Sequence, residues 1–498
     1  MPLPPEFPAG SAIDQRLLEA VRRCCEGVEA YFVGGLVRDL LLARRTADHD
    51  LVVAAEPRPI ARCLAAAVGA HCFPLDEERA IWRVVGDRFQ LDLERLQGGG
   101  IEADLGRRDL TINALAVPLD LGRVIDPLGG LGDLAAGRLR AASREAFRSD
   151  PLRVVRLARF ACELGFKPEE ETVTLAAQAA PALAGVAAER ILAELVRIVG
   201  GPNPPFGMGL LQRTGADRVV LPELVAERGV EQNPYHHLDV YDHTLECLAY
   251  AAALRDGLRG KNGGWELAGA GELEAFLSSI EGVREELAQR LSGPVGDGLD
   301  RFGGICFGAL LHDIAKPPTK TVGSRGWAAF PGHDLLGARM AEQIVRRLRG
   351  SRRLREYLAG LVAHHLRLGF LLHERDPLAP RTRYAYLRAC GPVGVDVTLL
   401  SVADRLATRG RNHEQAIAAH LNLAAQILPY ALAFEREGLP ALPLAGDELA
   451  RAVGIEPGPL LGELLEELRV AAYAGEVKDR AGAVAVARAL LASRKRGA

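Results

Sequence analysis

The chain contains 498 residues, of which 48% are hydrophobic and 25% are charged. At about 100 to 200 residues per domain, this length suits three or four globular units, and the composition excludes a largely disordered or collagen-like chain. The formal net charge of −3 excludes binding of a polyanion by a uniformly basic molecule. A nucleic-acid partner would therefore need local basic patches.

The cysteines and the N-terminus indicate the compartment. The eight cysteines form no CxxC pair, and the adjacent Cys24 and Cys25 fit neither a zinc knuckle nor a disulfide framework, which favours a reducing cytosol. The start of the chain lacks the basic and apolar regions of a signal peptide, and no run of about 18 apolar residues is free of charges. We therefore expect a cytoplasmic protein with no membrane partner.

The first 130 residues alternate between short apolar runs and helical stretches. An apolar run at 28–33 leads into a Gly-Gly turn and a short helix at 36–42, and a second run at 51–53 follows an Asp-His-Asp triplet. Two further strand-like runs begin at Ile81 and Phe89. This alternation predicts a mixed α/β region.

From Asp150 onward, apolar residues recur at the three and four spacing of helices, with Gly or Pro nearby. The fold class is therefore predicted to be α+β, with a mixed-sheet head followed by all-α parts. The predicted divisions are a head at 20–145, a helical neck at 146–228, an all-α domain at 229–425 with an insertion at about 257–300, and a helical tail at 426–498.

Asp48 and Asp50 alternate across one residue at the start of a β-run, so both side chains point to the same face of the strand. Two carboxylates on one face are costly unless a cation lies between them, and such oxygen ligands suit Mg²⁺. Upstream, Gly34 and Gly35 open a helix that carries Arg38, where backbone N–H groups can receive a phosphate. Either feature alone is also typical of a solvated turn, but together they predict a nucleoside triphosphate site for in-line attack by a hydroxyl.

A second block at 101–116 places two arginines, a carboxylate and an amide close together in sequence. Arg107 and Arg108 can fork onto phosphate oxygens, while Asp109 and Asn113 can bond a ribose hydroxyl.

A third block follows at 149–160, where Asp150 and Arg153 are neighbours on a predicted helix. Asp150 before Pro151 is also typical of a helix N-cap. Between 138 and 159, however, seven arginines accompany only two acidic residues, which predicts a phosphate-binding patch.

Four ordered segments resemble those of the class II tRNA nucleotidyltransferase and bacterial poly(A) polymerase family, namely 31–53, 101–116, 125–134 and 150–160. The resemblance implies a polymerase-β-like nucleotidyltransferase head, followed by a helical neck, body and tail. It also implies that Asp48 and Asp50 are catalytic and bind Mg²⁺. The residues implied to bind the nucleotide are Gly35, Arg38, Arg107, Arg108, Asp109, Asn113, Asp150, Arg153 and Arg156.

Within that set, the resemblance makes Asp150 and Arg153 the pair that reads the base of the incoming CTP or ATP, with Arg156 in support. The family commonly has Glu before this Asp, whereas this chain has Ser149, which cannot accept a hydrogen bond as an anion. A third catalytic carboxylate is unassigned, and the candidates are Asp92 and Glu94.

Histidines and aspartates recur through the helical part in an order typical of a metal site, as His243, His312, Asp313, His333, His364, His365 and Asp404. A metal explains a neighbouring His and Asp on a buried helix better than packing does. The order resembles the HD-domain metal phosphohydrolases. This resemblance implies core ligands at His243, His312, Asp313 and Asp404, and a second metal position completed by His333 and His364. The metal would be a divalent transition metal or Mg²⁺, and Lys316 is near enough in sequence to hold a phosphate.

The leading interpretation is a template-independent RNA nucleotidyltransferase that adds C, A or both to the 3′ end of tRNA from CTP and ATP. Its HD domain would hydrolyse phosphoesters. The alternatives are a poly(A) polymerase acting on another RNA 3′ end, and an HD phosphohydrolase whose head binds RNA without catalysis. CCA, CC-only and A-only addition remain open. A basic stretch at 346–355 is typical of a solvated helix face and could also follow an RNA backbone.

Overall fold

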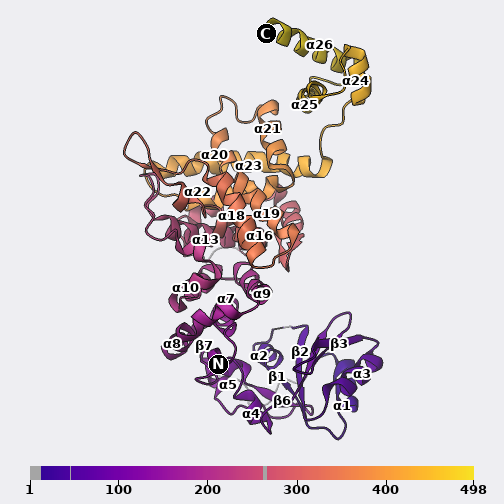
Figure 1. The fold of residues 1–498 in the computed structure, drawn as a ribbon, viewed down its shortest axis with the longest axis vertical. Helices are drawn as coiled ribbons and strands as arrows, with labels where there is room; N and C mark the ends of the chain where they lie inside the picture. Colours follow the sequence, from indigo (N-terminus) through magenta and orange to yellow (C-terminus); the bar gives the residue numbers. More distant parts are fainter. Residues whose placement is uncertain (1–12, 45, 262–265, 498) are drawn as a thin grey trace. The chain divides into compact units, whose positions relative to one another are not determined.

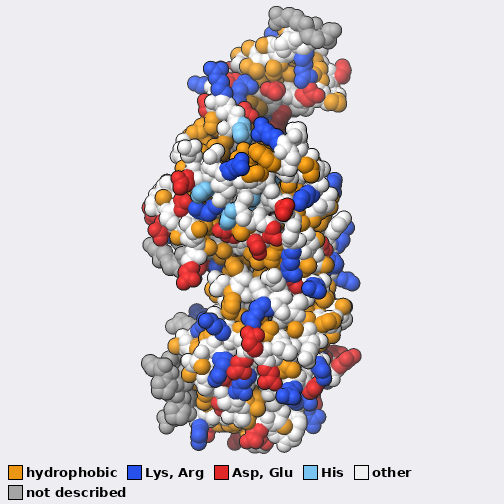
Figure 2. Space-filling view, turned by 90° about the vertical axis from the view of Figure 1, so that its left-hand side faces the viewer, with side chains coloured by type: hydrophobic (Ala, Val, Ile, Leu, Met, Phe, Trp, Pro, Cys, Tyr) orange, Lys and Arg blue, Asp and Glu red, His pale blue; other side chains and the backbone are white. Residues whose placement is uncertain are grey.

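The computed structural model describes residues 13–44, 46–261 and 266–497 (Figure 1). The chain divides into two compact units, of which the first comprises Met1–Glu194 with Phe206–Val220 and the second Leu195–Pro205 with Leu221–Ala498. The first unit contains the predicted head and most of the predicted neck, and the second contains the predicted all-α domain and tail. On the face drawn in Figure 2, basic and acidic side chains are interspersed over both units, as the small net charge leads us to expect.

A six-stranded mixed sheet organises the first unit, in the order β3-β4-β5-β2-β1-β6. Its strands are β1 (Ala30–Val33), β2 (Asp48–Val53), β3 (His71–Asp76), β4 (Ile81–Val85), β5 (Gln90–Arg95) and β6 (Ala116–Pro118). Strands β2 and β5 run parallel, and every other neighbouring pair is antiparallel. The predicted mixed α/β region is confirmed, and four of these strands begin within three residues of the starts of the predicted apolar runs.

Helices α1 (Gln15–Cys24) and α3 (Pro57–Val68) pack together, and α3 also packs on the sheet. Their apolar stripes bury Leu17 and Val21 on α1, and Ile60 and Leu64 on α3. This packing brings Cys24 and Cys63 into a disulfide, so the expectation that Cys24 takes no part in one is wrong. The two cysteines are 39 residues apart and meet only because the helices pack, which spacing along the chain does not reveal.

The region from Asp150 onward is helical, as predicted. The further helices of the first unit are α2 (Gly35–Leu41), α4 (Ile101–Leu105), α5 (Gly130–Ala135), α6 (Ala146–Ser149), α7 (Arg153–Leu164), α8 (Glu170–Ala179) and α11 (Asp217–Val220). Helices α9 (Ala188–Val199) and α10 (Pro204–Thr214) each contain residues of both units. Helix α7 is amphipathic and buries Val154, Val155, Leu157 and Ala158, which fixes the direction of the arginines on its other side.

The second unit is built on α13 (Val240–Leu258), α16 (Arg301–Leu311) and α22 (Gly394–Leu406), which pack against one another. They are joined by α12 (Pro222–Val225), α17 (Lys316–Thr319), α18 (His333–Arg347), α19 (Arg352–His364), α20 (Arg367–Leu371), α21 (Pro380–Cys390) and α23 (His413–Glu437). Gly308 lets α16 approach α19, since an added Cβ would lie 2.6 Å from Leu361 Cδ1. The apolar packing between these helices brings together the helix ends that carry the polar side chains described below.

The predicted insertion at about 257–300 contains helices α14 (Ala270–Ser279) and α15 (Arg284–Leu291), while its residues 262–265 lie outside the described residues. The tail forms α24 (Gly446–Val453), α25 (Pro459–Tyr473) and α26 (Arg480–Gly497), with a small core of its own around Leu449, Leu464 and Leu468. Two-stranded pairs complete the fold: β7 (Arg138–Leu139) with β8 (Lys167–Pro168), β9 (Pro294–Gly296) with β10 (Leu299–Asp300), and β11 (Thr321–Val322) with β12 (Ala328–Ala329).

One helix in the described part of the chain, α23, is long and apolar enough to cross a membrane by length and composition. More than half of its apolar window, 56%, is buried inside the protein, and α23 packs on α22. Both features are those of a core helix.

Candidate functional site

Four acidic residues share one face of the sheet in the first unit. Asp48 and Asp50 lie two apart on β2, and the parallel register places Asp50 directly opposite Asp92 on β5. Glu94 lies two residues further along β5, on the same side. We call Asp48, Asp50, Asp92 and Glu94 the carboxylate face. Asp92 also accepts two hydrogen bonds from Arg83, each of 2.7 Å.

Electrostatics make this face a natural cation site. Burial raises the pKa of Asp50, Arg108 opposes the shift, and the charges of Asp92 and Asp48 reinforce it. Burial likewise raises the pKa of Glu94, against Arg108 and with Asp50. Like charges this close disfavour one another's ionised form, and a cation would offset the repulsion. The donor set therefore fits the divalent ion expected at Asp48 and Asp50.

The Gly-Gly turn holds an arginine beside this face. Gly34 has a φ of 67°, and an added Cβ would lie 2.8 Å from Arg108 Nη1 and 3.1 Å from Asp50 Oδ2. Only glycine combines this backbone conformation with so close an approach. Gly35 lies next to the same carboxylate, at 3.8 Å from its own added Cβ.

Behind the face, four of the predicted nucleotide-binding residues bond in a chain. Arg38 Nη1 donates to Asn113 Oδ1 (2.6 Å), and Asn113 Nδ2 donates to Asp109 Oδ1 (2.8 Å). Asp109 Oδ2 accepts from Arg156 Nε and Nη2 (2.9 and 2.8 Å). Burial alone would raise the pKa of Asp109, but Arg156 and Asn113 hold it well below its usual range. We call Arg38, Asn113, Asp109 and Arg156 the buried network.

The two remaining arginines of the second block are more open than the network. Arg107 is exposed, and Arg108 is half-buried, with Nη2 3.3 Å from Asp104 Oδ2. Arg108 Nε is buried without a hydrogen-bond partner among the described residues. In the network, by contrast, the guanidinium of Arg38 also bonds both carboxylate oxygens of Asp39. Arg107 and Arg108 therefore offer more free donors to a ligand than Arg38 does.

The predicted base-reading pair lies at the start of α7, and each member is held by other groups. Arg153 Nη1 donates to Ala146 O (2.9 Å) and Ser149 Oγ (3.1 Å). Asp150 accepts from Arg190 Nη2 (3.1 Å), on α9. Ser149, which stands where the family commonly has Glu, thus orients Arg153 through its hydroxyl. Sequence reasoning missed Arg190, because nothing in the periodicity of its helix marks it.

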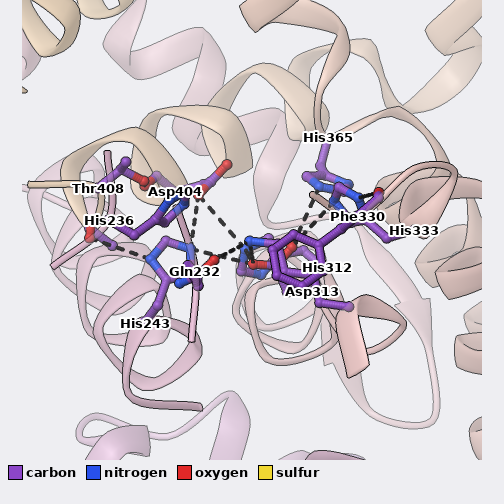
Figure 3. Close-up of polar contacts among 12 residues, drawn as sticks. Gln232, His236, His243, His312, Asp313, Phe330, His333, His365, Asp404 and Thr408 are labelled. Atoms are coloured by element: carbon purple, nitrogen blue, oxygen red, sulfur yellow. Dashed lines mark hydrogen bonds and ion pairs between the residues drawn. The ribbon is translucent and has the colours of Figure 1, made fainter. Parts of the chain in front are cut away.

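In the second unit, five helices deliver six side chains to one centre (Figure 3). The histidine–aspartate centre consists of His243 on α13, His312 and Asp313 after α16, His333 at the start of α18, His365 after α19, and Asp404 on α22. His312 and Asp313 have at most 1% of their surface exposed. The Nδ1 atoms of His312, His333 and His365 lie 2.8, 2.7 and 2.7 Å from backbone carbonyl oxygens. An Nδ1–H donor in these bonds leaves Nε2 as a free lone pair.

The Nε2 atoms of these histidines point toward two carboxylates (Figure 3). His243 Nε2 lies 3.1 Å from Asp404 Oδ1, and His312 Nε2 lies 3.2 Å from Asp313 Oδ2. The described residues include two triads that could each hold a metal ion, namely His243–His312–Asp313 and Asp313–His333–His365. Within each triad, the ligand atoms lie within 4.8 Å of one another. The Nε2 atoms of all four histidines are buried without a hydrogen-bond partner in the described structure. Orphaned lone pairs converging in this way fit a pair of metal ions that share Asp313.

The prediction of His364 as a ligand is wrong, because the structure places His365 in the centre instead. His364 is the last residue of α19 and is half-buried, and its Nδ1 accepts from Arg367 Nε at 2.9 Å. Neighbouring residues at a helix end point in different directions, so only one of the two can face the centre. The adjacent pair His364–His365 indicates a histidine of the metal site, but the sequence does not show which of the two faces the centre.

Charge coupling in the centre is strong. Without a metal ion, burial lowers the pKa of His312, but Asp313 and Asp404 outweigh it and raise that pKa to about 9. A cation in the centre would therefore replace the Nε2 proton of His312. Burial and the neighbouring His312 lower the pKa of His365 to about 4. Lys316 Nζ bonds both Asp313 Oδ2 and Gln232 Oε1, each at 2.6 Å. The predicted phosphate holder therefore lies at the centre.

Sequence reasoning did not single out Gln232 or His236. The His236 ring packs edge-on against that of His243, at 5.2 Å between centroids. Both residues precede α13, in a segment whose polar character is typical of any loop.

Three family models match successive parts of the chain. "Poly A polymerase head domain" matches residues 30–97 and 83–140, and "Probable RNA and SrmB- binding site of polymerase A" matches residues 165–227. "HD domain" matches residues 285–409.

Several curated proteins are similar over nearly their whole length. The A-adding tRNA nucleotidyltransferase of Deinococcus radiodurans is 33% identical, over 96% of this chain and 94% of its own. The CC-adding tRNA nucleotidyltransferase of Geobacter sulfurreducens is 32% identical, over 92% and 91%. That of Thermus thermophilus is 33% identical, over 90% and 91%.

Solved structures share the fold at lower identity. A CCA-adding enzyme in complex with CTP is 20% identical, with a TM-score of 0.60 over 97% of this chain and 96% of that one. The Thermotoga maritima CCA-adding enzyme in complex with tRNA is also 20% identical, with a TM-score of 0.58 over 97% of each chain.

Proposed function

The chain belongs to the tRNA nucleotidyltransferase family, and from this membership we propose that it adds C, A or both to the 3′ end of tRNA, using CTP or ATP. The observation that carries the proposal is the carboxylate face, where Asp48 and Asp50 lie beside Arg108 and the Gly34 turn. This arrangement combines acidic ligands, a phosphate-binding cation and a close backbone approach in one place.

In the proposed reaction, Asp48 and Asp50 would hold Mg²⁺, and the bound ion would supply positive charge that polarises the α-phosphoryl group and acidifies the RNA hydroxyl. Arg107 and Arg108 bind the triphosphate through their free donors. The terminal hydroxyl of the RNA attacks the α-phosphorus and loses its proton to solvent. The bond from the α-phosphorus to the α,β-bridging oxygen breaks, and pyrophosphate leaves. Because Asp50 lies opposite Asp92, we propose Asp92 as the further carboxylate of the site; its bonds to Arg83 fix its orientation.

The buried network connects α7 to the residues behind the carboxylate face, because Arg156 on α7 bonds Asp109. We propose that it positions Arg153, which presents donors to the incoming base while Asp150 presents an acceptor. Ser149 and Arg190 hold these two side chains from either side.

We further propose that the histidine–aspartate centre hydrolyses a phosphoester. His243, His312, Asp313 and Asp404 would hold one divalent ion, and His333 and His365 with Asp313 a second. Metal ions in such a centre supply an acidified water as nucleophile. Lys316 would bind a phosphoryl oxygen once substrate draws it from Asp313.

The two alternatives of the sequence analysis are set aside. The relatives that span nearly the whole chain are tRNA nucleotidyltransferases, which disfavours a poly(A) polymerase. A non-catalytic head would not need the complete carboxylate face. Because tRNA, ATP and CTP meet in the cytoplasm, we propose that the protein works there.

The proposal is tested with the full chain and three RNAs: tRNA ending before CCA, tRNA ending in CC, and an unrelated RNA. Each is offered labelled CTP, ATP or both. We expect incorporation on one or both tRNAs and far less on the unrelated RNA. Equal tailing of all three would contradict tRNA as the substrate, and no incorporation would contradict the transferase.

A further inference from the structure

A cavity of about 480 Å³ lies in the second unit, formed by α15, α16, α19, α21 and α23 and the turns beside them, and it contains none of the residues proposed for either centre. Its walls carry four arginines, Arg290, Arg301, Arg353 and Arg388, together with Phe434 and Leu439. Of these, Arg353 belongs to the basic stretch at 346–355, to which the proposed function gives no role.

One fully buried carboxylate and one half-buried carboxylate hold Arg290 and Arg301 in place. Asp396, which is fully buried, accepts from Arg301 Nε and Nη2 (3.0 and 2.8 Å) and from the Tyr357 hydroxyl (2.8 Å). It also lies 2.8 Å from Arg290 Nη2, and Glu435 bonds Arg290 Nε. The guanidiniums of Arg290 and Arg301 are therefore pre-oriented.

The cavity retains unused donors and an excess of positive charge. Arg290 Nη1 is buried with no hydrogen-bond partner in the described structure. Arg353 is exposed and forms no ion pair with any described residue, while Arg388, half exposed, is held through Nε by Glu466 (3.0 Å). Even with Asp396, Glu435 and Glu466 counted, the four arginines leave one positive charge. A buried guanidinium with an unpaired N–H is costly, and an anion in the cavity would offset the charge of Arg290 without contacting its buried Nη1.

The remaining wall is apolar and aromatic. Phe434 packs edge-on against Tyr384 and Tyr473, at 6.1 and 6.3 Å between centroids, which fixes its ring. Leu439 is 44% exposed beside it. A ligand that suits both walls carries a phosphate for the guanidiniums and a flat, largely apolar body for Phe434 and Leu439.

We propose that this cavity binds a nucleoside phosphate, with the phosphate on Arg353 beside the fixed positive charges of Arg290 and Arg301, and with the base against Phe434. The nucleoside phosphate could be a free mononucleotide or one nucleotide of a bound RNA. The RNA source gives the basic stretch a role, because Arg353 is one of its residues.

The test compares the full chain with Arg353→Glu and with Arg352→Glu. Arg352 is the matched control: it precedes Arg353 on the same helix and undergoes the same charge change, but it lies outside the cavity, where its Nε bonds Glu356 at 2.6 Å. Calorimetry measures the number of AMP, CMP and inorganic phosphate molecules bound per chain, and filter binding measures the affinity for tRNA that lacks CCA. Because Arg353 is exposed, its replacement should leave the fold intact, which a melting curve checks.

A free-nucleotide site predicts that the affinity for AMP or CMP falls at least tenfold in Arg353→Glu and stays unchanged in Arg352→Glu. It also predicts that the unmodified chain binds inorganic phosphate more weakly than it binds either mononucleotide. An RNA site predicts that Arg353→Glu lowers tRNA affinity at least threefold more than Arg352→Glu does, with mononucleotide binding unchanged. If the two variants behave alike toward nucleotides and tRNA, the proposal is wrong. Because these assays measure binding, they stand apart from any failure of nucleotide transfer.

Discussion

Gly34 occupies a position that no other residue can fill without moving Arg108 or Asp50. In Gly34→Ala, we expect a loss of stability of about 1 to 3 kcal/mol from the positive φ, and a large fall in nucleotide incorporation because Arg108 is displaced. Urea unfolding and single-turnover incorporation measure the two effects.

Gly69→Ala provides the control, since Gly69 also has a positive φ (72°) but an added Cβ there meets nothing within 4 Å. It should lose stability and keep its transfer rate. Equal rates in the two alanine variants would show that the turn does not position Arg108.

The two histidines at the end of α19 make a second test at this scale. His365→Ala should reduce bound divalent metal and hydrolysis of bis-p-nitrophenyl phosphate, since its Nε2 faces Asp313 and has no other partner in the described structure. His364→Ala should change neither, because His364 bonds Arg367 outside the centre. Metal analysis and the hydrolysis rate check both variants, and a reversed pattern would restore His364 as the ligand.

At the scale of elements, the Asp109–Arg156 ion pair of the buried network links α7 to the segment that follows α4. Asp109→Asn should destabilise the fold by about 2 to 4 kcal/mol at pH 7, because it removes the nearer of the two carboxylates beside Arg156 and leaves only Glu194, at 3.8 Å. The pKa of Asp109 is lowered in the folded state, so its contribution is complete above the ordinary carboxyl pKa of about 3.9 and declines as the pH falls below it.

Urea unfolding at about pH 7 and about pH 3.5 measures this contribution. The difference in the free energy of unfolding between wild type and Asp109→Asn should be smaller at the lower pH. A gap that widens in acid would mean that Asp109 is not stabilised as an anion.

The prediction of elements from sequence succeeded where local patterns carry the information. The runs that became β1, β2, β4 and β5 are continuous and apolar on at least one side, and so were predictable. Strand β3 was missed, because it is an edge strand that contains Pro74 and is nowhere fully buried. The opposition of Asp50 and Asp92 depends on which strands become neighbours, which no local pattern specifies.

The same distinction holds for the helical centre. The residues that converge in the centre were predictable by type and order, with the exception of His365, because metal chemistry restricts both; their role as ligands stays a prediction. Their convergence from five helices, and the place of Gln232 and Lys316 beside Asp313, follow from packing between segments far apart in the chain.

At the scale of the whole molecule, metal and stability should be linked in the second unit. The histidine–aspartate centre buries several polar atoms without partners in the described structure, so a bound ion should stabilise its fold. At a free metal concentration of about a hundred times Kd, the gain is about 2.7 kcal/mol. Calorimetric melting should show a lower Tm after treatment with a chelator. The decrease in Tm on chelation should be smaller in His365→Ala than in wild type. A wild-type Tm that the chelator does not change would contradict a metal in this centre.

The central claim is that the carboxylate face performs nucleotide transfer, and the most direct test is single-turnover transfer to tRNA lacking CCA by wild type, Asp50→Asn and Asp87→Asn. Asp87 is an exposed acid in the turn before β5 and is not a member of the carboxylate face, so it serves as the matched control. We predict a loss of about 10²- to 10³-fold or more in Asp50→Asn and a wild-type rate in Asp87→Asn. A wild-type rate in Asp50→Asn, with the variant folded, would contradict the account.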